Sequence, residues 1–250
     1  MIAQPMDASG FSTLASYFPD RTVITYDPRG LGRSTRKDGR VDNAPTVQAD
    51  DVHAVIAALG VGPVEMFASS GGAVTALALV RAYPNDVTRL VAHEPPLLAV
   101  LPDAQAAERA RVGVRDAYEA KGSGAGMAAF IAMTSWRGEF NDDYFARPAP
   151  DPAQYGMTTA LLPDRSWAVT NFRPDFDALT AAPIRIVIAV GEESAGTVTG
   201  RTSLVTAELL GQQATVFPSH HGGFMSGEYG YPGQPEAFAH KLRDVLNKDN

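Results

Sequence analysis

The segment Val64–Ala73 restricts the fold of this chain more than any other. A short apolar run passes directly into a helical one through residues 68–72, Ala-Ser-Ser-Gly-Gly. The small residues around Ser70 allow a sharp turn whose middle residue takes a strained backbone conformation. Such a turn needs a buried strand before it and a helix after it, and it leaves the serine hydroxyl above the carboxyl end of a sheet.

Other short apolar runs predict the remaining strands of that sheet. They alternate with longer amphipathic runs, which is typical of a largely parallel sheet covered by helices, the α/β class. The expected strands lie at residues 2–4, 22–26, 64–67, 89–92, 184–190 and 214–217. Helical periodicity predicts helices at residues 11–18, 52–59, 72–83, 104–120 and 125–134, and from 235 onward. With residues 2–4 as the last part of a strand, the chain should start inside the sheet rather than at its edge.

Residues 95–174 interrupt this alternation with two expected helices and a Pro-rich run at 147–152. At 250 residues, one core with an inserted subregion is favoured over two independent domains. We therefore expect a core of residues 1–94 and 175–250 and a lid of residues 95–174. Apolar lid side chains that could line a pocket are Met127, Phe130, Ile131, Met133, Trp136, Tyr144, Phe145 and Trp167.

Charge and composition exclude several classes of partner. The net charge is -7, and no run of Lys and Arg could follow a phosphate backbone or an anionic membrane, so we expect neither nucleic acid nor membrane as a partner. The absence of cysteine removes disulfides, thiolate nucleophiles and Cys-based metal sites. Without an apolar leader or an apolar run of bilayer length, a cytoplasmic protein is expected.

Residues 64–73 resemble the G-x-S-x-G nucleophile elbow of the α/β-hydrolases, with Ala68 in place of the first glycine. Residues 26–34 resemble the D-x-R-G-x-G-x-S turn of the same family, in which Asp27 and Arg29 are expected to hold the loop. The resemblance covers residues 2–94 and 183–246. It implies an α/β-hydrolase fold with a helical lid and with Ser70 as the nucleophile. The first two strands of the family's sheet are missing from this sequence.

A serine nucleophile needs an imidazole to accept its proton. His220 and His221 follow the last expected strand in a glycine-rich loop, at the same sheet edge as Ser70. In the family pattern Pro-x-x-His-x-Gly the base is the third residue after the proline, here Pro218, which selects His221 and leaves His220 as a loop residue. The other histidines lie on expected helices or end a strand (His53, His240 and His93).

The carboxylate that orients the imidazole is less well defined by the sequence. In the family it usually follows the strand at 184–190 as Gly-x-x-Asp, but Ser194 stands at that position. The first choice is Glu193, one residue away, which also fits the family order of serine, acid and histidine. Glu94, after the earlier strand, is its main rival, and Glu192 is the third candidate.

The resemblance implies an oxyanion hole made of the Gly71 N–H and a second main-chain N–H, for which Met6 is the candidate because Pro5 has none. The expected activity is cleavage of small carboxylic esters through an acyl-enzyme on Ser70. Alternatives are a cofactor-free perhydrolase, a lactonase or a C–C hydrolase of the same fold, or a non-catalytic binding protein. No metal or organic cofactor is expected. The partner is a small-molecule ester, and the sequence also allows a homodimer.

Overall fold

The computed structural model describes residues 1–37, 43–148, 151, 167–230 and 232–248. Its centre is a five-stranded sheet in which every neighbouring pair is parallel and the strand order follows the chain. The strands are β1 Ile2–Gln4, β2 Val64–Ser70, β3 Val87–His93, β4 Arg185–Gly191 and β5 Thr215–Phe217. The expected α/β class with a mostly parallel sheet is confirmed.

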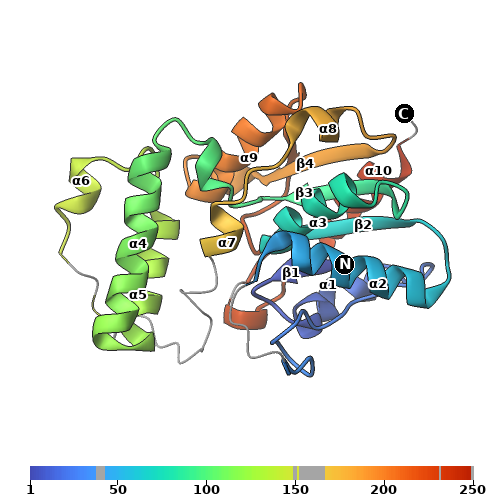
Figure 1. Ribbon diagram of the computed structural model, residues 1–250, viewed down its shortest axis with the longest axis horizontal. Helices are drawn as coiled ribbons and strands as arrows, with labels where there is room; N and C mark the ends of the chain where they lie inside the picture. Colours follow the sequence, from blue (N-terminus) through green and yellow to red (C-terminus); the bar gives the residue numbers. More distant parts are fainter. Residues whose placement is uncertain (38–42, 149–150, 152–166, 231, 249–250) are drawn as a thin grey trace.

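Helices cover both faces of the sheet (Figure 1). Right-handed crossovers between strands in sequential order place their helices on one face. This face carries α2 Pro45–Leu59, α3 Gly71–Ala82, α7 Trp167–Thr170, α8 Phe176–Thr180 and α9 Val198–Leu209. The opposite face is covered by α1 Ser12–Ser16, which follows the short 3-10 helix Ala8–Phe11, and by α10 Pro235–Asn247.

Side chains of the central strands alternate between two apolar cores, as a period of two residues requires. On β2, Met66 lies in the core beneath α3, whereas Phe67 lies in the core beneath α10. On β3, Leu90 and Val91 divide in the same way. The central strands are apolar throughout because both of their faces are buried.

Most of the expected elements are present, but the strand expected at residues 22–26 is wrong. That segment is not part of a strand, although Ile24 accepts a hydrogen bond from the Met1 amino group at 2.7 Å. A single bond of this kind does not make a ladder, so β1 is the edge of the described sheet and the chain does not start inside it. Gly60 ends α2 in the left-handed conformation, with φ of 64°, as its position in the sequence predicts.

Three helices of the inserted region lie to one side of the sheet in Figure 1. They are α4 Ala104–Lys121, α5 Ser123–Ser135 and α6 Asp142–Phe145. Near the ends of this region, Leu97 and Val169 belong to the main core, so the lid and the sheet share buried side chains. Half of the Pro-rich run, at 149–150 and 152, lies outside the described residues. None of the helices that the structure describes is long and apolar enough to cross a membrane.

Candidate active site

Ser70 ends β2 and precedes the first residue of α3, so strand and helix meet without a loop. Its backbone has φ 55° and ψ -130°, a conformation that costs a non-glycine residue about 1–3 kcal/mol. Ser70 is partly accessible to solvent, whereas Ser69 is only 1% exposed. The side chain of Ser69 is bound instead to buried His93. Of the two serines, Ser70 is therefore the accessible one.

The two glycines after Ser70 are required by the approach of β1. A Cβ on Gly72 would lie 2.5 Å from the Cα of Ala3, a distance that backbone atoms do not tolerate. A Cβ on Gly71 would lie 3.0 Å from the Cβ of Gln4. The elbow is therefore pressed against β1, and the N-terminus of α3 points to the same edge as Ser70.

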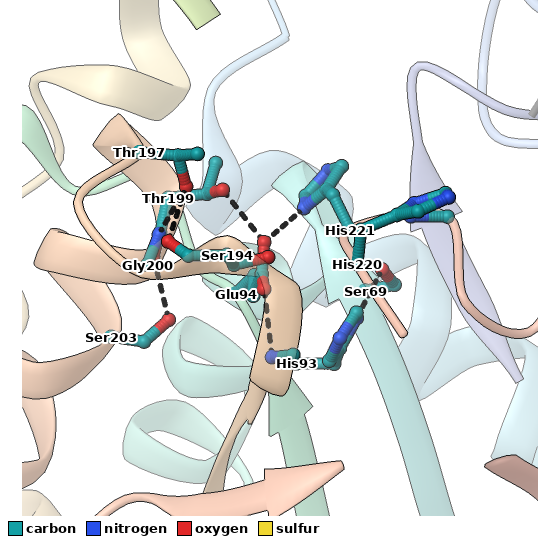
Figure 2. Close-up of polar contacts among 12 residues, drawn as sticks. Ser69, His93, Glu94, Ser194, Thr197, Thr199, Gly200, Ser203, His220 and His221 are labelled. Atoms are coloured by element: carbon teal, nitrogen blue, oxygen red, sulfur yellow. Dashed lines mark hydrogen bonds and ion pairs between the residues drawn. The ribbon is translucent and has the colours of Figure 1, made fainter. Parts of the chain in front are cut away.

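The carboxylate nearest to His221 is that of Glu94, the residue that follows β3. Its Oε2 atom lies 2.6 Å from the Nδ1 atom of His221 (Figure 2). Glu94 is completely buried and has φ of 49°, so this side chain, like Ser70, is held by a strained backbone at the end of a strand. The main-chain N–H of Gly191, at the end of β4, donates to its Oε1 atom at 2.9 Å.

Electrostatics fix the roles in this pair. Burial by itself would raise the pKa of Glu94, but the hydrogen bond and charge of His221 and a hydrogen bond from Ser194 hold that pKa well below its usual range. An ionised carboxylate only accepts hydrogen bonds, so the Nδ1 atom of His221 must carry the proton. The neutral ring then has its lone pair on Nε2, the arrangement that can take a proton from a serine hydroxyl.

The expectation that Glu193 pairs with His221 does not hold in the structure. Glu193 is exposed, and its carboxylate contacts the Gln234 side chain at 3.4 Å. Glu192 is also exposed and accepts a hydrogen bond from the Ser219 N–H at 3.2 Å. The physical reason is that the short 3-10 helix after β4 turns both side chains away, while the residue after β3 reaches the imidazole directly.

Two residues that the sequence did not assign to the site form hydrogen bonds with the Glu94 carboxylate. Ser194, which stands where the family's aspartate would be, is 3% exposed and hydrogen-bonded to the Glu94 carboxylate. The Thr199 hydroxyl, in the first turn of α9, donates to Oε2 of Glu94 at 2.6 Å (Figure 2). The only sequence signal for Thr199 is that it lies just after Thr197, which caps α9.

His220 has contacts typical of a loop residue, as the sequence predicted. Its Nδ1 atom accepts a hydrogen bond from the Gly222 N–H at 3.0 Å, and its Nε2 atom lies 3.2 Å from the Pro232 carbonyl oxygen. Asp27 likewise holds its loop by accepting from the N–H groups of Ala8 and Arg33.

The structure gives Met6, in the loop after β1, and Gln4, at the end of β1, different surroundings. Met6 is half-buried and packs against the core beneath α10. Gln4, the last residue of β1, is aligned with Ser70 in the sheet and is the residue that approaches Gly71. The assignment of Met6 as the second oxyanion donor therefore stays a prediction.

The aromatic residues of the lid pack mainly against one another. The Tyr144 ring contacts the rings of Trp136, Phe140 and Phe145 edge to face, with centroid distances of 5.5, 4.9 and 5.0 Å. The Arg109 guanidinium lies 3.5 Å from the centre of the Phe145 ring. These aromatic side chains form a core of the lid itself, and the Trp167 side chain lies outside the described residues. No group of His, Asp and Glu in the described part of the chain is arranged as metal ligands.

Comparison with known proteins supplies the family. The sequence model described as the alpha/beta hydrolase fold matches residues 5–135, which is more than half of the chain. The chain belongs to the α/β-hydrolase family. This α/β-hydrolase is also similar to the uncharacterized hydrolase YraK of Bacillus subtilis (strain 168), with 26% identity over 97% of this chain and 86% of the relative.

Solved structures share the fold of this α/β-hydrolase. An esterase from Exiguobacterium antarcticum aligns with a TM-score of 0.67 and 17% identity, over 99% of this chain and 91% of the other. A thermophilic esterase from Thermogutta terrifontis aligns with a TM-score of 0.64 and 20% identity, over 98% of this chain and 87% of the other. The proline iminopeptidase of Mycobacterium smegmatis aligns with a TM-score of 0.62 and 20% identity, over 98% of this chain and 88% of the other. At these identities the likeness concerns the fold, which in this set serves both esterases and a peptidase.

Proposed function

We propose that this α/β-hydrolase is a serine hydrolase that cleaves small carboxylic esters, with Ser70 as nucleophile, His221 as base and Glu94 as the orienting acid. The observation that carries the proposal is the 2.6 Å contact between His221 and the buried carboxylate of Glu94. A buried, ionised carboxylate on Nδ1 has little use in a binding protein, but it is what a general base needs in order to become an imidazolium.

The proposed reaction proceeds by acyl transfer. Ser70 Oγ attacks the ester carbonyl while His221 Nε2 accepts the hydroxyl proton, and Glu94 stabilises the imidazolium that results. The Gly71 N–H at the start of α3 and a second N–H, for which Met6 is the candidate, hold the oxyanion. His221 then protonates the leaving alcohol, and water activated by the same ring releases the acid from Ser70.

The test is hydrolysis of p-nitrophenyl esters from acetate to octanoate by the wild type and by Ser70→Ala, Glu94→Gln and Glu193→Gln. Glu94→Gln should lower kcat by about 10³–10⁴-fold, because a neutral amide no longer fixes the Nδ1–H tautomer. Ser70→Ala should lower kcat by at least about 10⁴-fold. Glu193→Gln is the matched control, because its side chain is exposed, and it should stay within about twofold of wild type.

The outcomes separate the alternatives. If Glu193→Gln were as inactive as Glu94→Gln, the assignment of the acid would be wrong. If no ester were cleaved but a fluorophosphonate labelled Ser70, the serine would be activated for another substrate, and lactones, peroxide and C–C substrates would be tried next. If the probe did not react, the chain would be a binding protein that has kept the fold.

A further inference from the structure

Two neighbouring strands end in strained residues at the site. Ser70 at the end of β2 has φ of 55°, and Glu94 just after β3 has φ of 49°. Each such conformation costs about 1–3 kcal/mol and persists only where the surroundings enforce it. The residues just before them, Ser69 and His93, are direct partners in the register of the sheet.

The side chains of Ser69 and His93 join these two strand ends. The Oγ atom of Ser69 lies 3.1 Å from the Nδ1 atom of His93, and both residues are buried, with 1% and 0% exposure (Figure 2). No water can replace this hydrogen bond at such burial, so breaking it would leave polar groups without partners, at a cost of about 1–3 kcal/mol.

Phenylalanine rings enclose His93 on the face of the sheet beneath α10. The centroid of its ring lies 5.2 to 6.3 Å from the centroids of four of them: Phe67, Phe217, Phe224 and Phe238. Within the described part of the chain, the Nε2 atom of His93 has no hydrogen-bond partner. The contact with Ser69 is therefore the one polar anchor of this side chain that the structure describes.

The ring of His93 also supports the ring of His221. The two imidazoles stack with centroids 5.9 Å apart and an angle of 21° between their planes. Burial lowers the pKa of His93 to about 4, so the supporting ring is neutral at neutral pH. A neutral neighbour does not repel the charge that His221 must take up during the proposed reaction.

The geometry points to Ser69 and His93 as a pair of positioning residues that holds the nucleophile turn and the acid turn in register and supports His221 by stacking. This inference rests on the proposed function. Ser69 and His93 touch no substrate, and they act through Ser70, Glu94 and His221. A shift of about 1 Å between these groups can cost about 10²-fold in rate.

The experiment compares Ser69→Ala, His93→Leu, their double variant and His93→Asn in the full-length protein. The first two should lower kcat and the rate of fluorophosphonate labelling by about 10–100-fold with KM unchanged, and the double variant should lose no more than the worse single variant. His93→Asn should recover part of the rate that His93→Leu loses, because its amide can still bond to the Ser69 hydroxyl although it has no ring to stack on His221.

A buried residue on the same strand is the control for packing. Val87→Ala, at the far end of β3, should lower the Tm as the site variants do but leave kcat and labelling unchanged. If Ser69→Ala labelled at the wild-type rate, or if His93→Asn lost as much activity as His93→Leu, the inference would be overturned.

A second readout separates this inference from the proposed function. If wild-type Ser70 failed to react with the probe, the function would be wrong, but the pair could still be tested by the NMR resonance of the His221 Nδ1 proton bonded to Glu94. We expect that resonance to shift or broaden in Ser69→Ala. An unchanged resonance would refute the positioning role, whether or not the protein has ester-cleaving activity.

Discussion

Replacing His93 by asparagine should change how the stability of the protein depends on pH. Burial, the largest cause, lowers the pKa of His93 from 6.5 to about 4; the charge of Glu94 opposes this shift, and the charges of His221 and His220 add to it. Between these two pH values the unfolded chain binds a proton that the folded protein does not bind. The free energy of unfolding must therefore fall as the pH falls from about 6.5 to about 4.

The size of this effect follows from the two pKa values. At about 1.36 kcal/mol per pKa unit, His93 should remove about 3 kcal/mol from the free energy of unfolding by pH 4, relative to neutral pH. Asparagine does not titrate, so the free energy of unfolding of His93→Asn lacks this pH-dependent decrease. Its smaller side chain adds a cavity cost that is the same at every pH.

Urea unfolding followed by tryptophan fluorescence measures the difference. At about pH 7.5 the wild type should have the higher free energy of unfolding. The difference between wild type and His93→Asn should change by about 3 kcal/mol in favour of the variant as the pH approaches 4. Parallel stability curves for the two proteins would show that His93 becomes charged as easily in the fold as in the unfolded chain, and would refute the reasoning.

Three further predictions concern the residues around the acid and the elbow. Thr199→Val removes a hydrogen bond to the charged Glu94, so the free energy of unfolding from urea titration should fall by about 1.5–3 kcal/mol. The depressed pKa of Glu94 stabilises the fold above its ordinary value of 4.5, so the stability gap between wild type and Glu94→Gln should narrow as the pH drops below that value. Gly72→Ala should cost more than about 1–3 kcal/mol, because its Cβ would meet the Ala3 backbone, whereas Gly113→Ala in α4 meets nothing and should raise the Tm.

The positions of Ser70 at a strand-to-helix turn and of His221 in the loop after β5 could be predicted from the sequence because local chemistry defines them. The strand before Ser70 and the glycines after it form one continuous signal, and Gly72 is needed where β1 passes within 2.5 Å of its missing Cβ. His221 lies in a short loop after β5, at the edge where parallel strands must all end. Neither inference needed distances between remote parts of the chain.

The carboxylate that pairs with His221 could not be predicted in the same way, because two strands end beside His221 and each is followed by glutamate. Sequence spacing favoured Glu193, but the choice depends on which backbone turns its side chain toward the imidazole. The positive φ of Glu94 is a property of the folded chain and leaves no mark in the sequence. The strand expected at residues 22–26 failed for a related reason, since a run of β-branched residues becomes a strand only where a ladder partner is present.

The position of Ser194 has a consequence for which substitutions the site can accept. Glu94, after β3, contacts His221, and Ser194, after β4, binds the same carboxylate through its hydroxyl. Neighbouring strands are about 4.8 Å apart, so an acidic side chain at either strand end can reach one imidazole nitrogen. A carboxylate placed at position 194 would therefore compete with Glu94 for His221.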